Sequence, residues 1–240
     1  MAASIFRQLH ERPGAFIMPN PWDIGSARIL ASMGFEALAT TSAGLAFSRG
    51  LLEGRLSPET VLAHCSDIVQ ATPLPVSADL EKGFGNSPQS VYDTIIAAAR
   101  TGLAGCSIED HTGDRQDPIF EFSLAVERIA AAVDACRSLP DDFVLTARCE
   151  NLLWGRPDLD DVIARLQAFE ATGADVLYAP GLSEANSIRQ LCAALDKPVN
   201  IVAERPGGGT DLREMADAGV KRISTGSALA CLAYGELLHA

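Results

Sequence analysis

Residues 76–109 have the sequence VSADLEKGFGNSPQSVYDTIIAAARTGLAGCSIE. Its two ends, Val76–Asp79 and Gly105–Glu109, are short apolar runs typical of buried strands. Between them, Ser87-Pro88 is a typical helix start with Ser87 as N-cap, and Gly102 can provide the left-handed cap at the helix end. The stretch therefore predicts a strand, a helix and a second strand parallel to the first.

The same alternation continues along the chain, with further helix ends at Gly173 and Gly219. About eight such units in 240 residues give 30 residues each, which fits a closed eightfold barrel. We therefore predict an α/β fold, a single (β/α)8 TIM barrel domain over residues 1–240. The predicted strands are Phe16–Met18, Ala37–Thr41, Val76–Asp79, Gly105–Glu109, Phe143–Arg148, Val176–Ala179, Val199–Val202 and Arg222–Thr225.

A doubly wound open sheet is the alternative fold. The first strand, however, is followed by Met18-Pro-Asn-Pro-Trp-Asp23 and not by the Gly-x-Gly-x-x-Gly of a dinucleotide fold. Gly207-Gly-Gly209 lacks the lysine of a phosphate-binding P-loop, so loop flexibility is the simpler interpretation of that run. Both observations favour the barrel.

The amino-acid composition argues against some classes of binding partner. The 31 acidic and 19 basic residues give a net charge of −12, which argues against a nucleic-acid partner. The sequence shows no secretory leader and no run of about 18 apolar residues, so we expect no membrane partner and a cytoplasmic location. The six cysteines are scattered without Cys-x-x-Cys pairs, and we expect reduced, mostly buried thiols.

Polar residues gather where the predicted strands end, which is the edge that forms the active site in such barrels. Asp79 and Glu81 are two positions apart, so on an extended strand they would point to the same side, and Glu109 ends the neighbouring strand. Three acids in one barrel mouth favour a divalent cation, Mg²⁺ or Mn²⁺, because oxygen ligands suit these ions. The alternative is a solvated acidic rim paired with Lys82 and Arg148.

The segment Thr41-Ser-Ala-Gly-Leu45 places small residues and backbone N–H groups at another strand end. Such N–H groups can form an anion-binding nest, and Arg148 can add a bidentate contact. A small anionic carboxylate or phosphonate is therefore the expected substrate. A tight turn would also explain the small residues Ser42, Ala43 and Gly44.

Taken together, these motifs resemble the isocitrate lyase and phosphoenolpyruvate mutase superfamily, from about Phe16 to Gly226. The resemblance implies a barrel of the phosphoenolpyruvate/pyruvate-binding type and a Mg²⁺-dependent enzyme that makes or breaks C–C or P–C bonds through an enolate-like pyruvate fragment. The motifs are Met18-Pro-Asn-Pro-Trp-Asp23, Thr41-Ser-Ala-Gly-Leu45, Ser77-Ala-Asp-Leu-Glu-Lys-Gly-Phe-Gly85, Gly105-Cys-Ser-Ile-Glu-Asp110, Leu145-Thr-Ala-Arg148 and Pro198-Val-Asn200.

The resemblance also implies roles for single residues. Metal ligands would be Asp79, Glu81, Glu109 and the more distant Glu53, although Glu81 and Glu53 stand where the family usually has aspartate. The substrate would be bound by Ser42, Ala43, Gly44, Arg148 and Asn200.

The loop His111–Pro118 departs from the family pattern. It lacks the cysteine of the lyases and the lysine and asparagine of the mutase, which leaves His111, Arg115 and Asp117 as possible replacements. For Arg115 and Asp117 a loop salt bridge is the favoured interpretation. We therefore expect Arg148, Glu109 and His111 as catalytic residues.

A further departure from the family concerns a single position. Ala179 stands where the lyases have a glutamate. His10 and His64 are expected at the surface or in an interface.

The function predicted from the sequence is a Mg²⁺-dependent lyase that cleaves a C–C bond of a small 2-oxo or 2-hydroxy carboxylate. A P–C bond hydrolase or mutase of the phosphonopyruvate type, or a non-catalytic oxo-acid-binding barrel, are the alternatives. We also expect a homo-oligomer, a dimer or tetramer, held together by apolar helix faces near the C-terminus.

Overall fold

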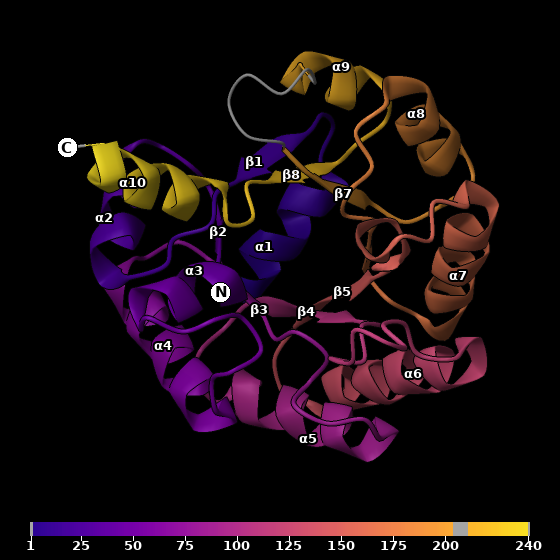
Figure 1. The fold of residues 1–240 in the computed structure, drawn as a ribbon, viewed down its shortest axis with the longest axis horizontal. Coiled ribbons are helices and arrows are strands. Elements are labelled where there is room, and N and C mark those ends of the chain that lie inside the picture. Colours follow the sequence, from indigo (N-terminus) through magenta and orange to yellow (C-terminus); the bar gives the residue numbers. More distant parts are fainter. Residues whose placement is uncertain (1, 204–210, 240) are drawn as a thin grey trace.

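The computed structural model describes residues 2–203 and 211–239. Eight parallel strands form one sheet in the order β1-β8-β7-β6-β5-β4-β3-β2. The two ends of this order meet where the Ala39 N–H donates to the Pro19 carbonyl at 3.1 Å. Figure 1 shows the strands as a ring with the helices outside it. The predicted (β/α)8 barrel is confirmed.

All eight predicted strands are present, and four of them are one to three residues shorter than expected. The strands are β1 (Phe16–Met18), β2 (Leu38–Ala39), β3 (Val76–Asp79), β4 (Gly105–Glu109), β5 (Val144–Arg148), β6 (Val176–Tyr178), β7 (Val199–Val202) and β8 (Arg222–Ser224). The helices are α1 (Ala2–Glu11), α2 (Ile24–Ser32), α3 (Ser42–Ser48), α4 (Pro58–Ala71), α5 (Pro88–Ala99), α6 (Phe122–Ser138), the 3-10 helix η1 (Asn151–Trp154), α7 (Leu159–Thr172), α8 (Ala185–Ala193), α9 (Leu212–Asp217) and α10 (Ala228–His239).

The helix ends follow the local signals in the sequence. The Ser57 side chain accepts from the Thr60 N–H at the start of α4, and Ser87 does the same for Ser90 at the start of α5. Gly173 ends α7 with a φ of 108°, a left-handed conformation that glycine adopts without steric penalty. These caps fix where each helix ends and the next strand begins.

Helix α1 packs against the strand starts, inside the ring in Figure 1. Phe6 is fully buried there, and Arg7 binds Asp142 and Asp175, which precede β5 and β6. His10 is also buried, with 7% exposure, so its expected surface position is wrong. The sealed end leaves the opposite end of the barrel, where the strands terminate, for a ligand.

Four other sequence expectations concern the rest of the molecule. His64 is buried in α4 with 6% exposure, which again contradicts the expected surface position. The six cysteines carry free thiols, and half of them are fully buried. Among the described residues, no helix is long and apolar enough to cross a membrane. The Gly207–Gly209 run lies outside the described residues.

Candidate active site

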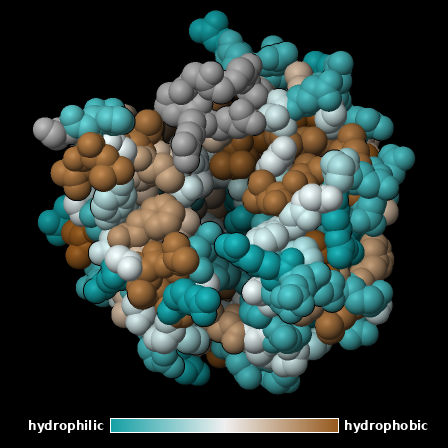
Figure 2. Space-filling view, viewed as in Figure 1, coloured by the Kyte–Doolittle hydropathy of each residue, from teal (hydrophilic) through white to brown (hydrophobic). Residues whose placement is uncertain are grey.

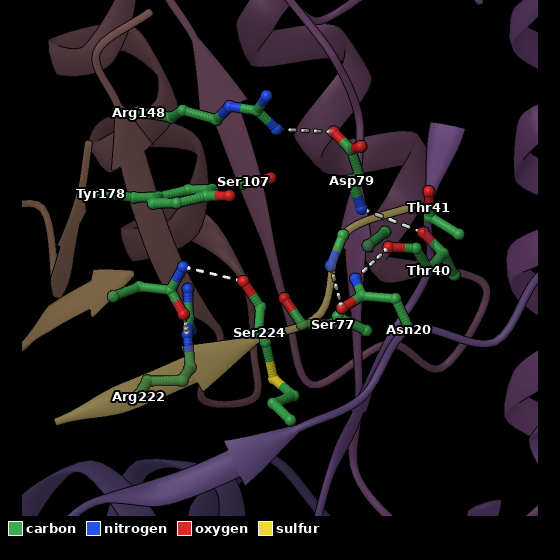
Figure 3. Close-up of a pocket in the computed structure, with 15 residues that line it drawn as sticks. Asn20, Thr40, Thr41, Ser77, Asp79, Ser107, Arg148, Tyr178, Arg222 and Ser224 are labelled. Atoms are coloured by element: carbon green, nitrogen blue, oxygen red, sulfur yellow. Dashed lines mark hydrogen bonds and ion pairs between the residues drawn. The ribbon is translucent and has the colours of Figure 1, made fainter. Parts of the chain in front are cut away.

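A small cavity of about 50 Å³, lined by both polar and apolar residues, opens inside the ring of strands. Figure 2 shows a hollow near the centre of this face, and Figure 3 shows the side chains that line the cavity. Three of the residues predicted from the sequence, Asp79, Arg148 and Asn200, contribute to the lining, as does Thr41. The cavity therefore lies where the sequence predicted the active site.

Arg148, the last residue of β5, stands among several carboxylates. Its Nη1 lies 3.9 Å from Asp79 Oδ1, and its Nε lies 3.5 Å from Glu109 Oε2. Its Nε also donates to Glu150 Oε1, and its guanidinium lies 5.0 Å from the centre of the Tyr178 ring. The neighbouring carboxylates raise the pKa of Arg148 although burial opposes this, so the side chain is a permanent cation.

Ser42 joins two acidic residues, Asp79 at the end of β3 and Glu53 in the loop after α3. Its N–H and its hydroxyl donate to Asp79 Oδ2 at 3.2 and 2.7 Å, and the hydroxyl also contacts Glu53 Oε1. One hydroxyl hydrogen cannot satisfy two ionised carboxylates, and burial together with Asp79 raises the pKa of Glu53. The cluster of Ser42, Glu53 and Asp79 therefore favours the binding of an added proton or cation.

Glu81 lies just beyond the end of β3, and the chain turns there. Its φ is +50°, and the Gly83 N–H donates to the Leu80 carbonyl at 2.9 Å. The expectation that Asp79 and Glu81 share one side of an extended strand is therefore wrong. The two residues remain neighbours, because the Glu81 N–H donates to Asp79 Oδ1 at 3.3 Å. Burial, followed by Asp79 and Glu53, raises the pKa of Glu81 to about 7.

Glu109 ends β4, and His111 lies next to it just after the strand. Glu109 Oε1 is 3.7 Å from His111 Nδ1, and the imidazole stacks on Trp154 of η1 with ring centres 4.1 Å apart. Burial raises the pKa of Glu109 well above its usual range, and it lowers the pKa of His111. A buried acid and a neutral imidazole in contact can share or transfer a proton.

The loop after His111 folds back as a hairpin. His111 pairs with Ile119 in an antiparallel bridge, and the Thr112 N–H donates to the Pro118 carbonyl at 2.8 Å. Asp117 approaches Arg156 at 3.8 Å, so its salt bridge goes to the segment after η1 and not to Arg115.

Arg115 and Lys82 do not neutralise the acids of this site. Arg115 is exposed and forms no ion pair with any described residue. Lys82 Nζ donates to the Thr112 carbonyl and to Asn86 Oδ1. Of the two basic residues expected to pair with the acidic rim, Arg148 therefore does so and Lys82 does not.

Comparison with known proteins identifies the family of this chain. The family model for phosphoenolpyruvate phosphomutase matches residues 6–240. The chain belongs to this family. The resemblance to the isocitrate lyase and phosphoenolpyruvate mutase superfamily is thus confirmed.

Three similar proteins illustrate the relationship. A solved structure from Burkholderia cenocepacia J2315, described as of the lyase/mutase class, is 56% identical with a TM-score of 0.97 and covers 100% of this chain and 86% of its own. The 2-methylisocitrate lyase of Escherichia coli K12 is 32% identical over 69% of this chain and 57% of its own length. The oxaloacetate decarboxylase of Ectopseudomonas mendocina is 28% identical over 94% of this chain and 78% of its own. The protein is an enzyme of the lyase/mutase type.

Within this phosphomutase-family chain, Ser42–Gly44 is not the free backbone nest expected from the sequence. These residues form the first turn of α3, where the Ser42 N–H is bound to Asp79 and the Gly44 N–H to Thr41 Oγ1. A Cβ on Gly44 would lie 2.6 Å from Thr41 Cγ2 and 2.9 Å from Trp22 Cβ. Packing alone thus requires glycine at position 44. Substrate binding by Ser42, Ala43 and Gly44 stays a prediction.

The sequence analysis missed two residues that contact Arg148. Tyr178 ends β6 and is the register partner of Arg148, whereas the predicted strand extends one residue further, to Ala179. Glu150, with 3% exposure, follows Arg148 by two positions, and its N–H donates to Asp110 Oδ1 at 2.8 Å. The position of Tyr178 at a strand end could have identified it. Nothing in the sequence indicated that Glu150 turns back to Arg148.

The donor set fits a hydrated magnesium ion better than a fully protein-bound metal. No group of three or more His, Cys, Asp or Glu side chains within residues 2–203 and 211–239 is close enough to hold a metal ion directly. The acids nevertheless offer only oxygen ligands, and burial, with neighbouring carboxylates adding to its effect, raises the pKa values of Glu53, Glu81 and Glu109. Because Mg²⁺ keeps several waters, it suits carboxylates spaced in this way.

Proposed function

We propose that the protein is a Mg²⁺-dependent lyase that cleaves a C–C bond of a small 2-oxo or 2-hydroxy carboxylate through an enolate-like pyruvate fragment. One observation carries the proposal: Arg148 lies between Asp79 and Glu109 at 3.9 and 3.5 Å, at the small cavity of a lyase-type barrel. This arrangement supplies a fixed cation for a substrate carboxylate and acids for a metal. The lyase and decarboxylase relatives, whose names denote C–C cleavage, support the same class of reaction.

Each side chain has a physical task in this proposal. Arg148, held by Glu150 and stacked near Tyr178, binds the carboxylate of the substrate, and Asn200 contacts it from β7. Asp79 would hold Mg²⁺, with Glu53, Glu81 and Glu109 reaching it through water. When bound, the metal withdraws electron density from the substrate oxygens and stabilises negative charge that develops on them.

His111 is the group that we propose to supply the proton. Trp154 holds its ring in place, and Glu109 lies 3.7 Å from its Nδ1. Cleavage of a 2-oxo acid leaves an electron pair on a carbon of the pyruvate fragment, whereas cleavage of a 2-hydroxy acid leaves it on the other fragment. In both cases the carbon that holds the pair must take up a proton before the product leaves. Replacement of His111 by Gln should therefore lower turnover more than substrate binding.

The surface supports an assembly of several copies. Leu232, Leu237 and Leu238 of α10 are 40%, 70% and 86% exposed, and Figure 2 shows hydrophobic side chains on the α10 side of the molecule. Exposed apolar helix faces of this kind often mark protein interfaces. We propose a homo-oligomer, a dimer or tetramer, that works in the cytoplasm.

The test is a product assay on a panel of oxo and hydroxy acids with Mg²⁺. It contains oxaloacetate, 2-methylisocitrate, 2-oxoglutarate and phosphonopyruvate. Release of pyruvate or another 2-oxo acid without phosphate supports the lyase, and its loss in Arg148→Met, but not in the exposed control Arg100→Met, ties it to this site. Phosphate release would indicate the P–C hydrolase, and binding without turnover would indicate a non-catalytic barrel.

A further inference from the structure

Asp110 is a buried carboxylate to which the proposed chemistry gives no task. It follows Glu109, the last residue of β4, and is 2% exposed. Its Oδ1 accepts from the Glu150 N–H at 2.8 Å, while its Oδ2 accepts no hydrogen bond from the described residues. That Oδ2 lies 3.4 Å from Nη1 of Arg165, a buried residue of α7. Asp110 and Arg165 therefore form an ion pair that is almost fully buried on both sides.

Stability alone does not explain this ion pair. Burying two charges costs free energy that their attraction often fails to recover, and an apolar pair of similar volume is frequently as stable. Arg165 Nη1 also donates to the Phe120 carbonyl at 3.1 Å, and Arg165 Nε has no hydrogen-bond partner among the described residues. The contacts of Asp110 point instead to a geometric reason.

Asp110 connects four segments around the site. Its N–H donates to the Arg148 carbonyl at 3.2 Å, and its carbonyl accepts from the Phe120 N–H at 2.9 Å. With the Glu150 and Arg165 contacts, it joins the ends of β4 and β5 to the base of the hairpin that begins at residue 111 and to α7. Only the contact with Glu150 leads from the Asp110 side chain to the cation of the site.

The backbone of Glu150 is held on both sides. Its φ of −91° and ψ of 0° lie in a sparsely populated region, so the chain has left the strand direction there. Asp110 binds its N–H, and the next residue, the fully buried Asn151, donates through Nδ2 to Asp161 Oδ2 at 2.6 Å. In this conformation the Glu150 carboxylate accepts from Arg148 Nε.

The contact with Glu150 determines where the Arg148 guanidinium stands. It is the only hydrogen bond of this guanidinium to residues 2–203 and 211–239. Arg148 lies 3.9 Å from Asp79 and 3.5 Å from Glu109, which are ion-pair distances too long for hydrogen bonds, and Figure 3 shows it reaching toward Asp79. Without Glu150, the guanidinium would close on these two acids, because direct charge-assisted bonds are stronger.

We propose that Asp110 is a positioning residue for Arg148. By fixing the Glu150 backbone, it makes Glu150 hold the guanidinium beyond hydrogen-bond reach of Asp79 and Glu109. The Nη groups of Arg148 then remain available for a substrate carboxylate. This inference rests on the proposed function for the task of Arg148, whereas the position of Arg148 can be measured without any substrate.

Two double variants remove the buried ion pair and differ in one acceptor. Asp110→Ala with Arg165→Met leaves the Glu150 N–H without its acceptor, whereas Asp110→Asn with Arg165→Met keeps an amide oxygen for it. Neither variant leaves a buried charge unpaired, so their comparison isolates the acceptor. If circular dichroism shows that the alanine variant is unfolded, Asp110→Leu with Arg165→Met replaces it, because leucine has a similar branched shape without an acceptor.

NMR of the Arg148 Nε–H group measures the position of the guanidinium. Its signal is assigned by its absence in Arg148→Lys, and Glu150→Ala gives the rate of exchange with water when the acceptor is missing. We expect the wild type and the asparagine variant to exchange at least about tenfold more slowly than Glu150→Ala, and the alanine variant to exchange as fast as Glu150→Ala. Slow exchange in the alanine variant, or fast exchange in the wild type, would overturn the positioning role.

Kinetics on the best acid of the product panel test the consequence for binding. The alanine variant should raise KM at least about tenfold over the asparagine variant, because Arg148 no longer presents its Nη groups to the substrate. A merely structural role would lower kcat in proportion to the folded protein lost and leave KM unchanged. An unchanged KM together with fast Nε–H exchange would therefore overturn the link from Asp110 to substrate binding.

The outcomes also separate this inference from the proposed function. Equal Nε–H exchange in the two double variants would overturn the role of Asp110, even if C–C cleavage is observed. The expected difference in exchange without cleavage of any acid in the panel would overturn the lyase and leave the positioning of Arg148 in place.

Discussion

Replacement of Gly44 by alanine tests how the first turn of α3 supports the site. An added Cβ would lie 2.6 Å from Thr41 Cγ2, 2.9 Å from Trp22 Cβ and 3.3 Å from Ala230 Cβ. The first two distances are shorter than carbon atoms tolerate, and Thr41 cannot rotate away without losing its bond to the Gly44 N–H at 3.2 Å. The variant must therefore displace α3 or its neighbours.

The expected change in the free energy of unfolding follows from three contributions. Overpacking of a filled site costs up to about 3 kcal/mol. Loss of the Thr41 cap adds about 1 kcal/mol. The lower entropy of alanine in the unfolded chain returns about 1 kcal/mol. The net destabilisation is about 1–3 kcal/mol, which lowers Tm by roughly 2–12 °C for a domain of this size.

Urea denaturation followed by circular dichroism measures this change. Gly25→Ala is the matched control, because Gly25 lies in the first turn of α2, is exposed and would place its Cβ 3.4 Å from Asp23 Oδ1. The control should be neutral or gain up to about 1 kcal/mol. If Gly44→Ala were as stable as Gly25→Ala, the packing argument for Gly44 would be refuted.

Three further predictions concern the metal, the pH dependence and the assembly. Asp79→Asn should weaken Mn²⁺ binding in calorimetry at least about tenfold, and the exposed Asp93→Asn should not; equal affinities would leave only an acidic rim. Burial lowers the pKa of His64 to about 4, so the unfolded chain binds a proton between pH 6.5 and 4 that the folded chain does not, and stability falls as the pH falls through this range. His64→Gln should reduce that slope by up to about 1.4 kcal/mol per pH unit, and an unchanged slope would contradict the burial argument. Light scattering should give a mass above the 25.3 kDa of one chain, reduced by Leu237→Glu with Leu238→Glu; a monomer at micromolar concentration would refute the assembly.

The strands and many helix ends could be predicted because their signals are local. A short apolar run, a serine before a helix and a glycine after it lie within one repeating unit, and Ser57, Ser87 and Gly173 behave as expected. The barrel then brings the strand ends together, which is why Asp79 and Arg148 were found as neighbours.

The errors concern contacts between distant segments and one unusual local backbone conformation. His10 is buried because α1 packs near the start of β8. Arg222 of that strand contacts the imidazole although it lies 212 residues further along the chain. The turn at Glu81 depends on a left-handed backbone conformation that a non-glycine residue seldom adopts, so the sequence favoured an extended strand. The partners of Arg222 likewise come from three separate strands and helices, and no local pattern shows them.

Cleavage of the best substrate in D₂O tests the central claim most directly. If a C–C bond breaks to give an enolate-like pyruvate fragment, the protonated carbon takes its hydrogen from groups that exchange with solvent, and proton NMR should show one deuterium per product molecule. This product should form without inorganic phosphate and should be lost in Arg148→Met. Release of phosphate, or a product without deuterium, would contradict the proposed lyase reaction.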